Sequence, residues 1–194
     1  MAKKSLKGGR FEREVSKQLS LWWTEGERDD VFWRSSQSGG RATTRAKGGK
    51  LTAGSYGDIT ALDSVGEPFL KYFCLELKRG YTKDTDVMAL LDSNQKRPVL
   101  LQHWNQCERD RKLGGILHSL VIIKRDHMTT CCYMNIDAYL SLVKAFNKEC
   151  KISSISFNNG SFDMLMFKFE DFLKIINPRK LEEVICDELH GVGD

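Results

Sequence analysis

The chain has 194 residues, of which 41% are hydrophobic and 29% are charged, and its formal net charge is +4. These values fit one globular domain of ordinary size with a hydrophobic core. They exclude a membrane-spanning chain, because no apolar run approaches the roughly 18 residues that a transmembrane helix needs. The basic N-terminus is not followed by the apolar core of a signal peptide, so we expect the protein to stay in the cytoplasm.

Positive charge is concentrated near the N-terminus. Residues 1–50 hold 12 Lys and Arg against 6 Asp and Glu, whereas residues 169–194 hold 3 against 7. Positive charge concentrated in one part of the chain suits binding to a polyanion such as nucleic acid, because Lys and Arg that neutralise phosphates release bound counterions. A solvated, flexible loop explains the basic residues equally well at this point.

The first predicted element is a helix over residues 7–23. Its apolar residues Phe11, Val15 and Leu19 are spaced by four, which places them on one stripe of the helix. Glu12 lies beside this stripe, near the start of the helix. A short strand over residues 31–34 follows.

Residues 35–57 are predicted to form a long flexible loop. They are rich in Ser, Gly, Thr, Arg and Lys and have almost no large apolar side chain. A loop of this length in a compact domain is usually functional or disordered. Residues 34–50 include no acid and carry the cations Arg34, Arg41, Arg45, Lys47 and Lys50.

Two strands are predicted next, over residues 58–63 and 71–78, joined as a hairpin by a turn at 65–68. The later predicted elements are a helix over 99–112 that ends at Gly114 and Gly115, strands over 116–124 and 129–135, a helix over 136–150, strands near 152–157 and 164–169, and an acidic helical tail. This order predicts an α/β fold in which a central mixed β-sheet is flanked by α-helices. We expect residues 1–135 to form the core and residues 136–194 to form a C-terminal extension packed on it.

Six cysteines are spread over the chain, at Cys74, Cys107, Cys131, Cys132, Cys150 and Cys186. There is no Cys-x-x-Cys pair, and the adjacent Cys131 and Cys132 would point to opposite faces of a strand. The four histidines also lack the spacing of a zinc site. We therefore expect reduced thiols rather than disulfides or a zinc centre.

The strand over residues 73–78 carries charge where a core is expected. Glu76 and Lys78 share one face of this strand, opposite the apolar Leu75 and Leu77. Charged side chains rarely lie on a central strand unless they are paired or functional. Asp58 opens the preceding strand, and in a hairpin it can face Glu76.

Two carboxylates and a backbone carbonyl on rigid strands are suitable ligands for a hard cation such as Mg²⁺. A neighbouring lysine, Lys78, could orient a water molecule or accept its proton. Glu12 could reach the same place from the first helix. The alternative is an ordinary salt bridge between Glu76 and Lys78, which is the commoner outcome for such a triplet alone.

Taken together, these segments resemble the PD-(D/E)xK nuclease superfamily, and within it the Holliday-junction resolvases of archaea, bacteria and their viruses. The resemblance covers about residues 5–125 and implies a restriction-endonuclease-like core. The matching segments are Lys7-Gly8-Gly9-Arg10-Phe11-Glu12-Arg13-Glu14, Trp33-Arg34-Ser35-Ser36, Gly57-Asp58-Ile59 and Glu76-Leu77-Lys78.

The resemblance implies that Glu12, Asp58 and Glu76 bind Mg²⁺ together with the carbonyl of Leu77, and that Mn²⁺ can substitute. Lys78 would contact the attacking water. The implied reaction is metal-dependent hydrolysis of DNA that leaves a 5′-phosphate. If the protein is viral, it would act in the host cytoplasm.

The family's supporting glutamine matches Gln102 on the predicted helix, with Gln106 one turn further on as a rival. His103 either faces the same cleft or lies on the exposed surface of the helix, and the sequence favours the surface.

The resemblance also implies a homodimer whose two sites nick opposing strands of a four-way or other branched DNA junction. The residues that we expect to contact DNA lie in the basic N-terminal segment, the segment after the first strand, and the basic loop. They are Lys3, Lys4, Lys7, Arg10, Arg34, Ser35, Ser36, Arg41, Arg45 and Lys47.

The sequence departs from compact archaeal resolvases in its longer loop before Asp58, in Gly57 where proline is common, and in about 70 further C-terminal residues. These departures leave the substrate open. Alternatives are a restriction-like or repair nuclease on the same scaffold, an RNA-directed nuclease, and a non-catalytic DNA-binding module.

Overall fold

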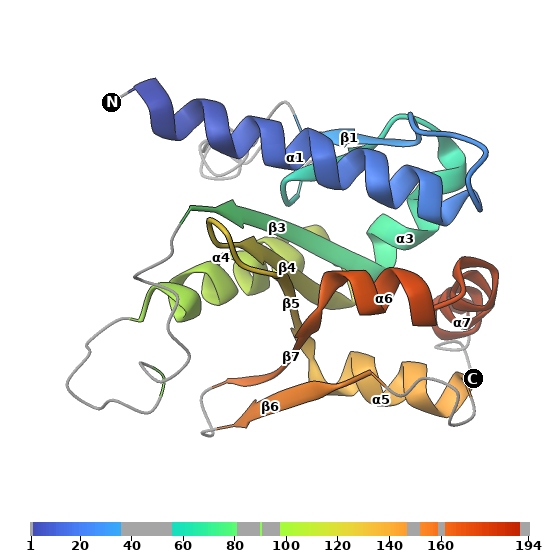
Figure 1. The fold of residues 1–194 in the computed structure, drawn as a ribbon. Coiled ribbons are helices and arrows are strands. Elements are labelled where there is room, and N and C mark those ends of the chain that lie inside the picture. Colours follow the sequence, from blue (N-terminus) through green and yellow to red (C-terminus); the bar gives the residue numbers. More distant parts are fainter. Residues whose placement is uncertain are drawn as a thin grey trace.

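A computed structural model describes residues 2–35, 56–80, 90, 98–146, 152–158 and 162–190, with the backbone alone at 2–7 and at 190. The fold is α/β, with a five-stranded mixed sheet and a separate two-stranded ribbon (Figure 1). Its elements are α1 (Ala2–Trp23), β1 (Phe32–Arg34), β2 (Ile59–Ala61), η1 (Ser64–Gly66), α3 (Glu67–Tyr72), β3 (Phe73–Arg79), α4 (Val99–Gly114), β4 (His118–Lys124), β5 (Thr130–Asn135), α5 (Ile136–Ala145), β6 (Ser154–Asn158), β7 (Asp163–Lys168), α6 (Phe169–Ile175) and α7 (Pro178–His190).

The large sheet has the order β3-β4-β5-β7-β6. Strands β3 and β4 are parallel, with Glu76 opposite Val121, and α4 is the crossover between them. The remaining neighbours are antiparallel. The predicted central mixed sheet flanked by helices is therefore confirmed, and β3 is one of its edge strands.

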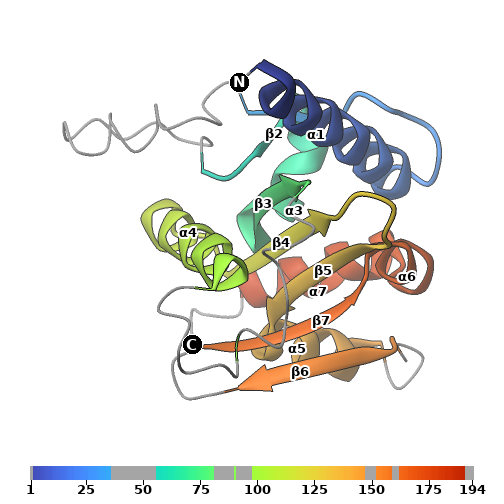
Figure 2. The same cartoon turned by 60° about the vertical axis from the view of Figure 1, so that its left-hand side comes forward.

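The sheet separates two hydrophobic cores. Helix α4 covers one face, where its buried Leu100, Trp104 and Cys107 pack with Cys74 of β3. Helices α1, α3, α5, α6 and α7 contribute to the core on the other face (Figure 2). This division follows from the alternation of side chains along β3, which sends successive residues to opposite faces.

The predicted stripe of the first helix is buried as expected. Phe11, Val15 and Leu19 are at most 2% exposed. At the end of α1 an aromatic cluster forms around Phe69 of α3, whose ring centroid lies 5.4 Å from that of Trp23. Helix α1 is thus packed against the core from Phe11 to Trp23, and Glu12, near the middle of the helix, is held in a defined place.

The predicted hairpin of strands 58–63 and 71–78 is wrong. Residues 64–72 form η1 and α3 instead of a turn and the start of a strand. Pro68 lies in the first turn of α3, where its missing N–H is not needed, and the helix buries Phe69 and Tyr72. Strand β2 pairs antiparallel with β1, and Asp58, just before β2, hydrogen-bonds to Leu75 of β3.

The C-terminal segment joins the central sheet. Strand β7 pairs with β5, with Met134 opposite Leu165, and β6 pairs with β7. Leu181 and Ile185 of α7 belong to the same core as α1. The predicted helix over 136–150 is observed as α5, and residues 147–150 lie outside the described residues. In the part of the chain that the structure describes, no helix combines the length and apolar character needed to span a membrane.

One carboxylate ties α4 to two strands of the sheet. Glu108 accepts hydrogen bonds from Arg111 Nε at 3.1 Å, Ser119 Oγ at 2.6 Å and Asn135 Nδ2 at 3.4 Å. Burial alone would raise the pKa of Glu108, but the hydrogen bonds from Arg111 and Ser119 outweigh burial and hold this pKa below its ordinary value. The ionised form is therefore favoured by folding.

We expect Glu108→Gln to lower the free energy of unfolding by about 1–3 kcal/mol near neutral pH, because buried donors lose a charged acceptor. A folded-state pKa below the unfolded value means that this stabilisation is present above the unfolded pKa of about 4.5 and is lost as pH falls through the folded value. Urea unfolding of both proteins between pH 7 and pH 3 measures the difference. The exposed Glu170→Gln serves as control, and a pH-independent difference would contradict the role of the charge.

Candidate active site

Asp58 is placed by a close approach of β2 to β3. Its N–H donates to Leu75 O at 2.7 Å, and its Oδ2 accepts from the Leu77 N–H at 2.8 Å. The preceding Gly57 has φ +85°, and a Cβ there would lie 2.6 Å from Leu75 O. Only glycine allows this contact without strain. Asp58 thereby meets β3 although no hairpin forms.

Glu76 and Lys78 lie on the same face of β3, as the alternation predicts. Glu76 is only 1% exposed, and the Lys78 ammonium donates a hydrogen bond to its Oε1. Lys78 Nζ also lies 4.0 Å from Asp58 Oδ2. One lysine therefore contacts both buried carboxylates.

Glu12 enters the site from α1. Its Oε2 lies 3.3 Å from Arg34 Nε of β1 in an ion pair. The same oxygen is buried and makes no hydrogen bond of good geometry among the described residues. Glu12 therefore has an acceptor that the surrounding protein does not fully satisfy.

The three carboxyl groups share an excess of negative charge. Burial raises the pKa of Glu12, Asp58 and Glu76 above their ordinary values, and the charge of Asp58 raises the pKa of Glu12 and Glu76 further. The Lys78 ammonium opposes this rise at all three. Because the rise persists, the cations nearby do not balance the three carboxylates.

The carboxylates do not form a ready-made metal site. In the described ranges, no three Asp, Glu, His or Cys side chains converge closely enough to hold an ion. Each carboxylate instead contacts the protein: Glu12 contacts Arg34, Asp58 contacts the Leu77 N–H, and Glu76 contacts Lys78.

Helix α4 presents His103 rather than Gln102 to its buried side. Gln102 is exposed and Gln106 is half-buried, whereas His103 is 8% exposed. The expectation that His103 lies on the surface is therefore wrong. Burial, together with the charge of Lys78, lowers the pKa of His103 to about 4. The imidazole is uncharged near neutral pH.

Asp110 was also missed by the sequence analysis. Its charge raises the pKa of both Asp58 and Glu76, which places it on the site side of α4. The spacing of His103, Cys107 and Asp110 by four and three residues was the available signal, because it marks one face of a helix.

The residues predicted to contact DNA are only partly described. Arg10 is exposed on α1, and Arg34 is held beside Glu12. Ser35 is 3% exposed, and its N–H donates to Asp58 O at 2.8 Å, so this residue helps to hold the backbone at Asp58 in place. The side chains of Lys3, Lys4 and Lys7, and the whole of Ser36, Arg41, Arg45 and Lys47, lie outside the described residues.

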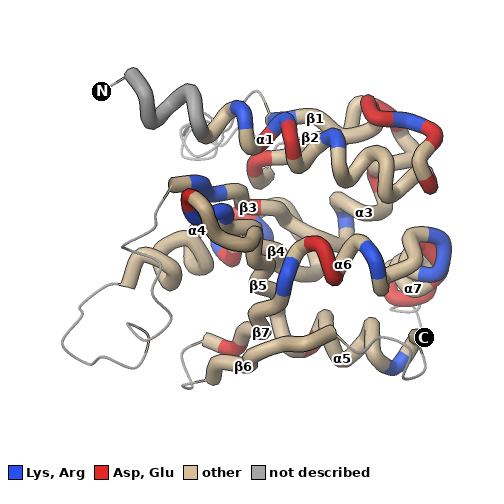
Figure 3. Tube along the Cα trace, in the orientation of Figure 1, with Lys and Arg blue, Asp and Glu red and all other residues tan. Residues whose placement is uncertain are grey.

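Further cations lie at the end of β3 and β4 beside α1 (Figure 3). Lys124 Nζ and Arg79 Nη1 lie 3.1 Å and 3.8 Å from the two carboxylate oxygens of Glu14. These cations are engaged in ion pairs that hold α1 against the sheet.

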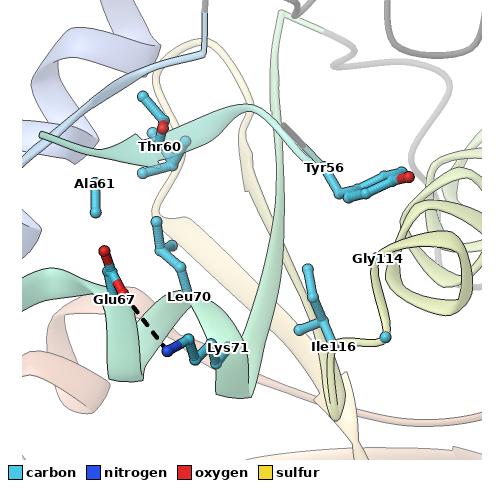
Figure 4. Close-up of a pocket in the computed structure, with 10 residues that line it drawn as sticks. Tyr56, Thr60, Ala61, Glu67, Leu70, Lys71, Gly114 and Ile116 are labelled. Carbon is cyan, nitrogen blue, oxygen red and sulfur yellow. Dashed lines mark ion pairs between the residues drawn. The ribbon is translucent and has the colours of Figure 1, made fainter. Parts of the chain in front are cut away.

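A groove of about 560 Å³ lies between β2, α3 and the C-terminal end of α4. Figure 4 shows Tyr56 beside Gly114 on one side and Leu70 near the Glu67–Lys71 ion pair on the other. None of the candidate catalytic residues lines it. The groove is therefore separate from the carboxylate site.

An acid at the start of one strand, a Glu-x-Lys segment on its neighbour and a helical glutamate define the core of a PD-(D/E)xK nuclease. Residues 3–183 match the family model described as "Phage putative PDDEXK endonuclease". The chain therefore belongs to this family, with a restriction-endonuclease-like fold, and it is a nuclease that hydrolyses phosphodiester bonds. No match was found among curated proteins or among solved structures.

Proposed function

We propose that the protein is a Mg²⁺-dependent DNA endonuclease that cuts branched DNA, four-way junctions above all. The observation that carries the catalytic part is the contact of Lys78 with both Asp58 and Glu76, two buried carboxylates held on rigid strands. A surface salt bridge would leave these groups exposed, whereas Glu76 is almost fully buried. Buried charge of this kind is retained mainly for function.

The donor atoms of these residues suit a divalent cation, which would have to draw the carboxylates closer together than they lie in the structure. The unsatisfied oxygen of Glu12 could accept such a cation, and the cation would favour the ionised form of three carboxyl groups whose pKa values are raised, chiefly by burial. Glu12, Asp58, Glu76 and the carbonyl of Leu77 would hold Mg²⁺, or Mn²⁺ in its place, because all four supply oxygen ligands. When bound, the cation acidifies a water molecule and stabilises charge on the scissile phosphate.

The chain's own cations do the remaining work. Lys78 orients the attacking water, because its ammonium lies between the two carboxylates. Arg34, which faces Glu12, is placed to contact a phosphate oxygen once a cation binds the carboxylate. Arg10 and the basic N-terminal turns of α1 would extend this contact along the DNA backbone.

Selectivity for branched DNA and action as a homodimer are supported by the likeness of the N-terminal, acidic and Glu-x-Lys segments to junction resolvases. Two linked sites would cut opposing strands of one junction. An activity on DNA would take place in the cytoplasm, which for a viral protein would be the host's.

A panel of DNA substrates tests this proposal. With Mg²⁺, a synthetic four-way junction should be cut faster than a linear duplex of the same sequence by roughly tenfold or more, a difference of about 1.4 kcal/mol in activation free energy. A cruciform plasmid should be linearised directly, because a dimer cuts both strands during one encounter. Equal rates on linear duplex would refute junction selectivity, and nicked plasmid alone would refute paired cutting.

A further inference from the structure

The direction of α4 fixes which of its residues faces which residue of β3. The helix connects two parallel strands, so it runs antiparallel to both of them. One contact sets the register: the Cys107 thiol donates a hydrogen bond to Cys74 O at 3.2 Å, and both residues are buried. Beyond this contact, β3 continues to later residues, towards Glu76. Because α4 is antiparallel to β3, the residues of α4 that lie alongside are earlier ones, towards His103.

Residues that share one face recur at similar distances along β3 and along α4. Two residues along a strand advance about 6.6 Å, and four residues along a helix advance about 6 Å. The step from Cys74 to Glu76 therefore brings the strand level with His103. The Lys78 side chain bends back to the same level, because its ammonium donates to Glu76. His103 thus faces the pair of Glu76 and Lys78 from the side of α4.

An imidazole at this place needs an explanation other than packing. Its helical neighbours on the same face, Leu100 and Trp104, are apolar or aromatic and fill the core. A polar ring that is 8% exposed is costly to bury unless its nitrogens interact. An uncharged imidazole offers one acceptor nitrogen, which suits a neighbouring ammonium.

We propose that His103 is a positioning residue that holds the Lys78 ammonium against the Glu76 and Asp58 carboxylates. This inference rests on the proposed function only for its effect on cleavage; the placement of the lysine can be tested without it. The residue takes the place in which the sequence suggested Gln102. Helix α4 thereby contributes to the site through its buried face.

Two kinds of replacement test this role. His103→Leu and His103→Phe both remove the polar atoms of the imidazole but differ in shape, one aliphatic and one aromatic. If one variant fails to fold, the other still tests the role. His103→Gln keeps an uncharged acceptor. Leu100→Ala is the matched control, because it removes packing from the same buried side of α4, three residues before His103, and leaves the contact between Cys107 and Cys74 intact.

Lys78 reactivity gives a measurement that does not require cleavage. Acetylation by an N-hydroxysuccinimide ester, followed by mass spectrometry of the Lys78 peptide, should be several-fold faster in the apolar variants than in the wild type. His103→Gln and Leu100→Ala should react at the wild-type rate. Thermal unfolding of each variant checks that the fold is intact.

Junction cleavage supplies the second measurement. Under single-turnover conditions the apolar variants should cut roughly 10–100-fold more slowly, as for other residues that orient a catalytic group. DNA affinity in Ca²⁺ should be unchanged, and His103→Gln should recover most of the rate. Wild-type lysine reactivity and wild-type cleavage in the apolar variants would overturn the proposal. A wild type that cuts no DNA would refute the proposed function, while lysine reactivity would still decide the role of His103.

Discussion

Replacing Glu76 with Gln is expected to slow DNA cleavage by roughly three orders of magnitude, because loss of a proposed metal ligand would remove several kcal/mol of transition-state stabilisation. Glu76 is nearly fully buried on an edge strand, and it shares the Lys78 ammonium with Asp58. The amide keeps the shape of the side chain but cannot supply the charge. Asp58→Asn should have a similar effect for the same reason.

Binding of DNA should survive both substitutions. The exposed cations that attract phosphates are unchanged, and affinity should still fall steeply with salt. Electrophoretic mobility shift without divalent cation measures binding, and single-turnover cleavage in Mg²⁺ measures the rate.

Glu14→Gln is the matched control for these variants. It makes the same chemical change two residues after Glu12, at a side chain that contacts Lys124 and Arg79 instead of the site. This variant should cut at close to the wild-type rate. Undiminished cleavage by both Glu76→Gln and Asp58→Asn would show that the chemistry lies elsewhere.

Much of the fold could be predicted because its patterns are local. The spacing of Phe11, Val15 and Leu19 defines a helix face, and the alternation in residues 73–78 places Glu76 and Lys78 together. These periods depend only on the geometry of one element. The structure accordingly shows a helix and a strand at these places, although α1 already begins at Ala2 and β3 begins at Phe73, two residues later than predicted.

The predicted hairpin failed because its signals were ambiguous. The segment Val65-Gly66-Glu67-Pro68 contains turn residues, but Pro68 is also well suited to the first turn of a helix. The decision depends on Phe69 and Tyr72, which are buried against residues distant in sequence. Tertiary packing of this kind is not visible in a local pattern.

The side chain that α4 turns towards β3 could not be predicted for a related reason. Choosing between Gln102 and His103 requires the rotation of α4 about its axis relative to β3. That rotation is set by contacts such as the one between Cys107 and Cys74. Neighbouring residues on a helix differ by about 100° in direction, so the position in the sequence alone does not tell which of Gln102 and His103 lies on the buried side of α4.

The second large effect is expected at Gly57, where Ala should lower the free energy of unfolding by about 2–4 kcal/mol and abolish efficient cleavage. A left-handed backbone costs a non-glycine residue about 1–3 kcal/mol. At Gly57, with φ +85°, the added Cβ would also lie 2.6 Å from Leu75 O. This oxygen accepts the hydrogen bond from the Asp58 N–H, so relief of the clash must move Asp58 away from β3.

Gly80→Ala separates the two contributions. Gly80 has φ +93°, but a Cβ there would meet nothing within 4 Å, so its substitution carries backbone strain without a clash. Urea unfolding and junction cleavage should show a moderate loss of stability and nearly normal activity for Gly80→Ala, and larger losses of both for Gly57→Ala. If the two variants were equally stable and equally active, the close approach of Gly57 to Leu75 would not be what places Asp58. A larger loss at Gly57 would show that the position of Asp58 depends on a backbone contact that only glycine permits.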